Sequence, residues 1–292
     1  MMITLYQQIL NLFRSFGSIL KVLVISKFYI SFPQTRFRKQ VIILGTGPSL
    51  AETLLKNLTV LKDNDTIGLN HFAEKEEFII LQPKYYVIGA PELWLENLND
   101  YYTQKSIKLF SVINDKTDWP LTLFIGIDGR SSARLKLISE NKNITISYYN
   151  RTPIEGNESI RRLLYNCNLG MPRPHNVLIP SIMISIWMGY KQIYLVGADH
   201  SWHESLRILD DNTVQLAQKH YFDIKEHWNT MKYSGKRDRK MHEIFEKWML
   251  SFRGYFDIKK YATKKNIKIW NASYKSYIDA FDRVDLNEQF GS

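Results

Sequence analysis

Residues 41–50 read Val-Ile-Ile-Leu-Gly-Thr-Gly-Pro-Ser-Leu, an apolar run followed by a turn that contains two glycines. Four large apolar residues in succession, without polar alternation, are typical of a parallel strand that is covered on both faces. Residues 50–58 then show the three- and four-residue apolar spacing of a helix. A buried strand, a tight turn and a helix in this order predict a doubly wound α/β sheet.

Further apolar runs repeat this pattern along the chain. We expect strands at residues 66–69, 85–88, 107–112, 121–127, 144–148, 192–196 and 267–270, and helices at 159–165, 179–188 and 239–264. The alternation predicts a mostly parallel, Rossmann-like α/β domain over residues 40–292. Residues 200–240 break the alternation with scattered aromatic and charged side chains, which favours a small lid over a site at the sheet edge.

The composition excludes several classes of protein. The chain has 292 residues, of which 45% are hydrophobic, and one cysteine, Cys167. This length supports an ordinary buried core, and a single cysteine excludes a disulfide framework or a multi-cysteine metal site, as expected in the cytoplasm. Because Arg14, Lys21 and Lys27 interrupt the one long apolar region, we expect no helix that spans a membrane.

Residues 1–39 differ from the rest of the chain in charge and in pattern. Six of the lysines and arginines that produce the net charge of +10 precede the first acidic residue, Glu52. Apolar side chains recur on one helical face: Leu5, Ile9, Leu12, Phe13, Phe16, Ile19, Leu20 and Leu23. We expect a basic amphipathic helix that lies on the inner-membrane surface, or that packs on the protein's own core or on a second subunit, which leaves a homo-oligomer open.

Nucleic acid is not an expected partner. Subtracting the six amino-terminal charges from +10 leaves +4 for the remaining chain, and no motif for binding DNA or RNA is present.

The turn after the first strand predicts a site for an anion. Glycines at positions 45 and 47 let a phosphate approach the main-chain N–H groups. Ser49 and Glu52 have the spacing of a capping box, which would direct the positive end of the helix at the turn. The turn lacks the third glycine of the dinucleotide motif and the lysine of the P-loop, so we expect neither an NAD enzyme nor a P-loop ATPase.

Polar side chains follow three of the expected strands. Asn70, Asp199 and Asn271 each come directly after an apolar run. Ligands of open α/β sheets bind at the carboxyl ends of the strands. The three side chains together with the glycine turn therefore predict a pocket that reads the base and ribose of a nucleotide.

Two long motifs carry a resemblance to known families. Residues 41–50, Asn70 and residues 188–199 (Met-Gly-Tyr-Lys-Gln-Ile-Tyr-Leu-Val-Gly-Ala-Asp) resemble the bacterial sialyltransferases typified by Campylobacter enzymes. They equally resemble polysaccharide-cluster proteins named after the hydroxymethylpterin diphosphokinase domain. The likeness extends over about residues 40–282 and implies a variant of the GT-A fold.

The sialyltransferase resemblance implies an enzyme that moves an acidic sugar, of sialic acid or Kdo type, from a CMP-activated donor to a surface glycan of capsule or lipopolysaccharide. It implies inversion at the sugar, no metal and no cofactor other than the donor substrate. It also implies contacts to the donor from eight residues: Gly45, Thr46, Gly47, Ser49, Asn70, Asn176, Gly197 and Asp199.

The general base is the weakest part of the resemblance. The resembling enzymes keep a histidine after a glycine in the loop before the long helix, and this chain has none there. His220 and His200 are the candidate replacements, and His220 is favoured because it lies in the loop before the long helix. Lys236, Arg237 and Arg239 are candidates to meet the departing phosphate.

Two alternatives keep the fold and change the function. One is pyrophosphoryl transfer from ATP to a pterin-like alcohol, which needs Mg²⁺ and several carboxylates. The other is a nucleotide-binding protein without catalysis.

Overall fold

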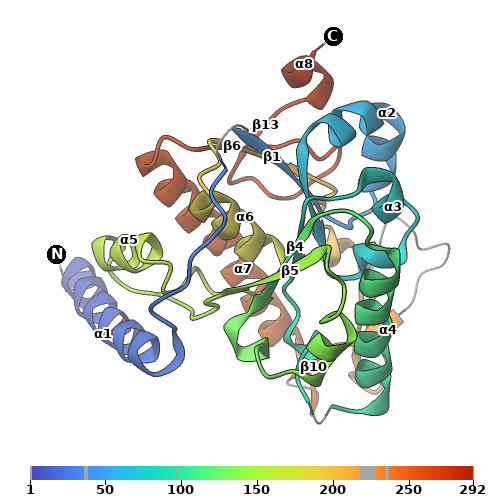
Figure 1. The fold of residues 1–292 in the computed structure, drawn as a ribbon. Helices are drawn as coiled ribbons and strands as arrows, with labels where there is room; N and C mark the ends of the chain where they lie inside the picture. Colours follow the sequence, from blue (N-terminus) through green and yellow to red (C-terminus); the bar gives the residue numbers. More distant parts are fainter. Residues whose placement is uncertain (1, 36–38, 97, 218–227, 234–236, 292) are drawn as a thin grey trace.

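The fold is built on one parallel sheet of eight strands. The computed structural model describes residues 2–35, 39–96, 98–217, 228–233 and 237–291. The strands are β1 (Gln40–Leu44), β2 (Asp65–Leu69), β3 (Tyr85–Ile88), β4 (Leu121–Gly126), β5 (Ile144–Tyr149), β6 (Gln192–Val196), β12 (Lys268–Asn271) and β13 (Asp282–Arg283). They lie in the order β13-β12-β6-β1-β2-β3-β4-β5, and every neighbouring pair is parallel (Figure 1). The predicted doubly wound α/β sheet is confirmed.

Helices cover both faces of this sheet. They are α2 (Leu50–Asp63), α3 (Glu77–Leu81), α4 (Asp100–Lys116), α5 (Glu158–Asn166), α6 (Leu178–Trp187), α7 (Met241–Lys264) and α8 (Leu286–Phe290). Strand β1 shows the division: Val41 and Ile43 belong to the cluster packed by α6 and α7, whereas Ile42 and Leu44 belong to the cluster packed by α2, α3 and α4. A strand buried on both faces must be apolar throughout, which explains the unbroken run at residues 41–44.

The strand expected at residues 107–112 is wrong, because these residues lie in the middle of α4. The buried side chains of this helix are Ser106, Leu109, Phe110 and Ile113, which is helical spacing. Asn99 caps the helix by accepting a hydrogen bond from the backbone of Tyr102 at 3.1 Å. A short apolar run fits a strand and a buried helix equally well, so the run alone could not decide.

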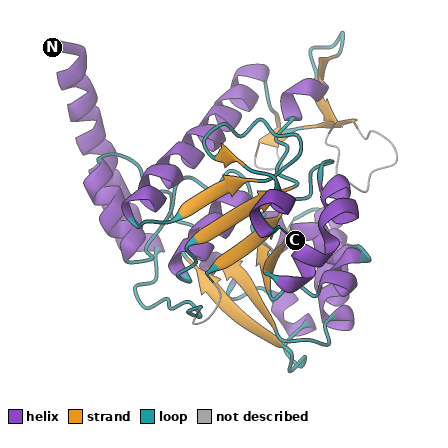
Figure 2. Cartoon of the chain, turned by 90° about the horizontal axis from the view of Figure 1, so that it is seen from above, coloured by secondary structure: helices purple, strands orange, loops and turns teal. Residues whose placement is uncertain are grey.

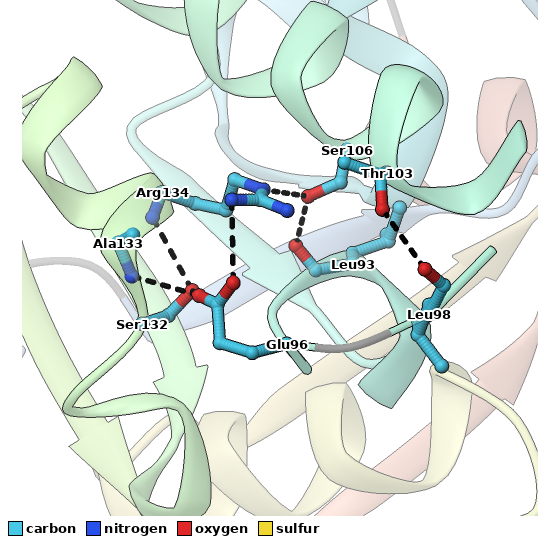
Figure 3. Close-up of polar contacts among 8 residues, drawn as sticks. All are labelled: Leu93, Glu96, Leu98, Thr103, Ser106, Ser132, Ala133 and Arg134. Carbon is cyan, nitrogen blue, oxygen red and sulfur yellow. Dashed lines mark hydrogen bonds and ion pairs between the residues drawn. The ribbon is translucent and has the colours of Figure 1, made fainter. Parts of the chain in front are cut away.

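A buried arginine fixes the segments that follow β3 and β4. Arg134 donates from Nε to Ser106 at 3.1 Å, and Ser106 donates to the carbonyl of Leu93 at 2.6 Å (Figure 3). Glu96 accepts from the backbone of Ala133 at 2.9 Å. Both segments leave the carboxyl ends of parallel strands, so the network stabilises one side of the edge at which ligands bind in such sheets.

The region expected to form a lid contains a small antiparallel sheet. After the short 3-10 helix Trp202–Ser205, it comprises β7 (Leu206–Ile208), β8 (Val214–Ala217) and β9 (Trp228–Thr230), and a separate pair joins β10 (Lys232–Tyr233) to β11 (Arg237–Asp238). Val214 and Leu216 pack on Ile244 and Trp248 of α7. The small sheet is therefore attached to the first turns of α7. That it closes over a ligand stays a prediction.

The amino-terminal helix α1 (Met2–Ile25) attaches to the body by a polar side. Ser18 donates to the backbone carbonyl of Glu155 at 3.1 Å and accepts from its N–H at 2.9 Å. Ser26 donates to the carbonyl of Leu169 at 2.6 Å, and Ser15 accepts from the backbone of Asn157 at 2.8 Å. Figure 2 shows the amino-terminal half of this helix extending beyond the rest of the molecule.

Candidate functional site

The glycine turn lies where the winding of the sheet reverses. From β1 the chain continues to β2 on one side, whereas β6 and β12 lie on the other side. The turn after β1 contacts the turn after β6 through two backbone hydrogen bonds of 2.8 Å, from Gly45 N–H to Val196 and from Gly47 N–H to Gly197. In open α/β sheets this reversal point forms the crevice in which ligands bind.

Both glycines are required by contacts within the protein. A methyl group at Gly45 would lie 2.7 Å from the carbonyl carbon of Gly197, and closer still to its oxygen. At Gly47 it would lie 2.7 Å from the oxygen of Gly197 and would overlap the carboxylate of Asp199. These close contacts alone account for glycine at both positions. The approach of a phosphate, which was the expected reason, is not needed. Thr46 lies between them and is partly exposed.

The carboxylate of Asp199 lies at the amino-terminal end of α2. This carboxylate accepts from the backbone N–H of Ser49 at 3.0 Å and from the Ser49 hydroxyl at 2.8 Å. Asp199 is 4% exposed, and burial raises the pKa of its carboxyl while the hydrogen bonds from Ser49 oppose the rise. The expected capping box is wrong, because Ser49 has helical backbone angles and directs its side chain to Asp199.

Asn70 joins the ends of β2 and β3. Its backbone is left-handed with φ of 44°, a conformation that asparagine tolerates better than most residues. The side-chain oxygen accepts from the backbone of Gly89 at 2.9 Å, and the backbone carbonyl accepts from the hydroxyl of Tyr86. Asn70 is half-buried at the carboxyl edge of the sheet, as expected from its place after the strand.

A hydrogen-bonded chain runs from β6 to the start of α6. Tyr255 donates its hydroxyl proton to Oδ1 of Asn176 at 3.1 Å, and Nε2 of His200 lies 2.6 Å from the Tyr255 oxygen. Oδ1 of Asn176 also accepts from the backbone of Leu178 at 2.9 Å, so this atom is an acceptor. Because the one hydroxyl proton goes to Asn176, Nε2 of His200 must carry a proton and donate it to Tyr255.

This geometry disfavours Nε2 of His200 as a general base. His200 is 8% exposed and has a left-handed φ of 53°. Burial lowers the pKa of its imidazole to about 3. A base works best when its pKa lies near the working pH, which leaves His220 as the preferred candidate. His220 lies outside the described residues, and so does Lys236.

Of the other expected site residues, some make contacts within the protein away from the reversal point, and the rest lie at the carboxyl edge of the sheet. Arg237 forms an ion pair of 2.6 Å with Glu243 at the start of α7. Asn271 is 1% exposed, donates to Ser276 at 3.0 Å and accepts from the backbone of Ser273. Asn271 therefore shapes the loop after β12, and both protons of its amide group are donated within the protein, to Ser276 and to the carbonyl of Ile278. Seven of the expected donor-binding residues lie on the carboxyl edge of the sheet, as the sequence predicted: Gly45, Gly47, Ser49, Asn70, Asn176, Gly197 and Asp199. Their contacts to the donor stay predictions.

A cavity of about 310 Å³ lies beside this edge, at the end of β12. Its lining includes Asn57, Asn271, Arg283 and Asp285. Ser273, which also lines the cavity, accepts from the backbone of Ala198 at 2.9 Å, so the cavity borders the loop after β6. We favour the reversal point over this cavity because the turns after β1 and β6 and the carboxylate of Asp199 meet there.

Comparisons with known proteins support no family assignment. No protein-family model matches the chain, and no curated protein matches it. Its fold is similar to the structure of the MAf glycosyltransferase from Magnetospirillum magneticum AMB-1, with a TM-score of 0.49 and 11% sequence identity. The likeness covers 90% of this chain and 37% of the MAf chain. At this level of similarity nothing about the chemistry of this chain follows.

Sequence reasoning missed His175 at this edge. Among the described residues, the Nε2 atom of His175 and the Nδ2 atom of Asn176 are both buried and have no hydrogen-bond partner. His175 stands in no motif, and only its contacts in the folded chain distinguish it from the other histidines.

Proposed function

We propose that this protein is a glycosyltransferase that binds a CMP-activated acidic sugar at the reversal point of its sheet. The observation that supports the proposal is that Asn70, Asn176 and Asp199 lie at the carboxyl edge of the sheet, where Asp199 binds the segment after β1. Carboxylate and amide groups placed in this way can hydrogen-bond the base and the ribose of a nucleotide. In this proposal the transfer inverts the sugar, needs no metal and delivers the sugar to a surface glycan.

Neither alternative has an observation in its favour. Pyrophosphoryl transfer from ATP needs carboxylates that hold Mg²⁺. Across the part of the chain that the structure describes, no three His, Cys, Asp or Glu side chains come together in a group that could hold a metal ion. A binding protein without catalysis would share the same nucleotide site and would differ only in turnover.

A calorimetric titration with CMP, CDP, UDP, GDP and ATP tests the donor assignment. We expect CMP to bind at least about tenfold more tightly than the purine nucleotides, a difference of about 1.4 kcal/mol. If CMP fails to bind and another nucleotide binds, the donor assignment is wrong. If CMP binds and no CMP-sugar donor is ever turned over, the protein is a binder without catalysis.

We also propose that α1 holds the protein on the cytoplasmic surface of the inner membrane. Its apolar stripe faces solvent, with exposure between 38% for Ile19 and 70% for Phe13. The side that packs on the body is made of Ser15, Ser18 and Ser26 with Val22. The stripe therefore does not cover the protein's own core, which was one of the expected partners.

The serine contacts favour a helix that lies in the membrane surface. By length and composition, the segment Leu5–Ile25 could cross a membrane, and most of its residues are exposed. This differs from the expectation of no spanning segment. The serines bind the second half of α1 along the loop at residues 152–157, so this half cannot be surrounded by lipid. An apolar stripe on one side, with Arg14 and Lys21 elsewhere, suits an interfacial helix.

Two phenylalanines provide the test of membrane binding. Changing both Phe13→Gln and Phe16→Gln, at positions 70% and 62% exposed, should weaken sedimentation with phosphatidylglycerol vesicles about tenfold or more, because each ring loses apolar burial. High salt should weaken binding of the unchanged protein, since each cation contributes about 1 kcal/mol near an anionic surface.

The matched control changes an exposed phenylalanine that lies outside α1. Phe256→Gln changes an exposed phenylalanine of α7 and should leave vesicle binding unchanged. Deleting residues 1–39 is a poorer test, because Phe32 is buried against Trp187, with ring centroids 5.1 Å apart. If the Phe13 and Phe16 changes leave vesicle binding intact and alter the sedimentation coefficient instead, the stripe is a subunit interface and the membrane proposal fails.

A further inference from the structure

The start of α2 is an unfavourable place for a donor phosphate. The backbone N–H of Ser49 and the Ser49 hydroxyl both bind the carboxylate of Asp199. The positive end of this helix already has its anion, supplied by the protein. A phosphate brought to the glycine turn would meet the charge of Asp199, so the phosphate needs another site on the same edge.

The start of α6 has unused hydrogen-bonding groups. Oδ1 of Asn176 is occupied by the backbone N–H groups of Leu178 and Ile179 and by the hydroxyl of Tyr255. Nδ2 of the same side chain and Nε2 of the neighbouring His175 are buried, and within the described part of the chain neither atom has a hydrogen-bond partner. Buried polar groups without partners are rare and costly in folded proteins, and a ligand that accepts from both would remove the cost.

Three cations lie close enough to His175 to act on its charge. The charges of Arg173, Lys247 and Arg239 all act on His175. Arg173 is paired with Glu155 at 3.2 Å. Lys247 is half-buried on α7, where burial and Arg239 lower the pKa of its ammonium and Glu92 opposes them.

Of the two carboxylates that act here, Glu155 is paired with Arg173, and Glu92 acts on Lys247 without forming an ion pair with it. Among the described residues, no carboxylate pairs directly with Lys247. Lys247 is therefore a cation that a bound anion can use.

We propose that His175, Asn176, Lys247 and their neighbouring arginines form the binding site for the phosphate of the nucleotide donor, and that His175 takes up a proton when the phosphate binds. This inference rests on the proposed function and names its phosphate subsite. Nδ2 of Asn176 and Nε2 of His175 donate to the phosphate oxygens, and Lys247 supplies charge.

The proton uptake follows from the surroundings of the histidine. Within the protein, burial and then Arg173, Lys247 and Arg239 lower the pKa of His175 to about 4, whereas Glu155 opposes them. The negative charge of a bound phosphate offsets these positive charges, and a phosphate oxygen accepts a hydrogen bond from Nε2, so the pKa of His175 rises. At pH 6 to 7 the imidazole is neutral before binding and accepts one proton from the buffer on binding.

Calorimetry with inorganic phosphate and with CMP tests both parts. Titrations at pH 6.5 in buffers of different ionisation enthalpy give the number of protons exchanged on binding, to which the ionisation of the phosphate itself also contributes. H175Q should lower the number of protons taken up by about one relative to the unchanged protein and weaken phosphate binding about tenfold or more. K247M should weaken binding about tenfold or more and leave the number of protons exchanged unchanged. The controls H203Q and K260M change exposed residues of the same types and should alter neither quantity.

The outcomes separate this inference from the proposed function. CMP binding that H175Q and K247M leave unchanged would overturn the phosphate site and leave the glycosyltransferase proposal standing. Phosphate binding that depends on both residues, without binding of any nucleotide, would support the site and overturn the function. If H175Q and the unchanged protein exchange the same number of protons on binding, the proton uptake by His175 is overturned, and binding of free sialic acid without phosphate binding would reassign the site to a carboxylate.

Discussion

Gly45→Ala should lower the free energy of unfolding by about 3 kcal/mol or more, the upper part of the range for overpacked sites. The new methyl group would lie 2.7 Å from the carbonyl carbon of Gly197 and 2.8 Å from the carbonyl oxygen of Val196. These are backbone atoms of the adjacent central strand, so no side chain can move to make room. Relief requires β1 and β6 to separate at their carboxyl ends, which breaks the hydrogen bond from Gly45 to Val196.

Gly17→Ala is the matched control. Gly17 lies within α1, and a methyl group there would meet nothing within 4 Å. Because alanine favours a helix by about 1 kcal/mol over glycine, this variant should be as stable as the unchanged protein or slightly more so. Urea unfolding followed by tryptophan fluorescence measures both variants. If Gly45→Ala unfolds within 1 kcal/mol of the unchanged protein, the close contact of the two strand ends is wrong.

His220→Ala should lower turnover of a CMP-sugar donor by a factor of about 10² to 10⁴ with donor binding intact, the usual contribution of a general base. His200 is the less suitable base because Nε2 donates to Tyr255 and burial lowers the pKa to about 3. The measurement is the rate of CMP release at saturating donor together with the dissociation constant from calorimetry.

His200→Asn separates the two histidines. Asparagine tolerates the left-handed backbone at this position, where φ is 53°. This variant should lose stability through the missing contact to Tyr255 and should keep turnover within about tenfold, since the residue positions Tyr255 and does not take the proton. A folded His200→Asn protein with collapsed turnover, beside an unchanged rate for His220→Ala, would transfer the role of base to His200.

Local patterns predicted the sheet well. Strands β1, β3 and β6 lie within a residue of their expected bounds, because buried parallel strands need unbroken apolar runs. The same rule failed at α4, where residues 107–112 contain Lys108 and Ser111 among apolar side chains and are helical. The exposed stripe of α1 has helical periodicity in the sequence, but periodicity does not tell which side meets the protein.

The contacts that define the site are long-range and could not be predicted. Ser49 has the local pattern of a capping residue, yet its hydroxyl binds Asp199, which lies 150 positions later in the chain. The charges that act on His175 include those of Lys247 from α7 and of Arg173 from the loop before α6. Motif spacing describes neighbours along one element, whereas these side chains meet only when helices from separate segments converge on one edge of the sheet.

The central claim is that a cytidine nucleotide binds at the reversal point between β1 and β6. Backbone amide chemical shifts recorded during titration with CMP test this claim most directly. The claim predicts the largest changes at Gly45, Gly47 and Ser49, at Asn70 and Asn176, and at residues 197–200. Changes confined to the residues of the 310 Å³ cavity at the end of β12, such as Tyr274 and Asp285, would contradict it.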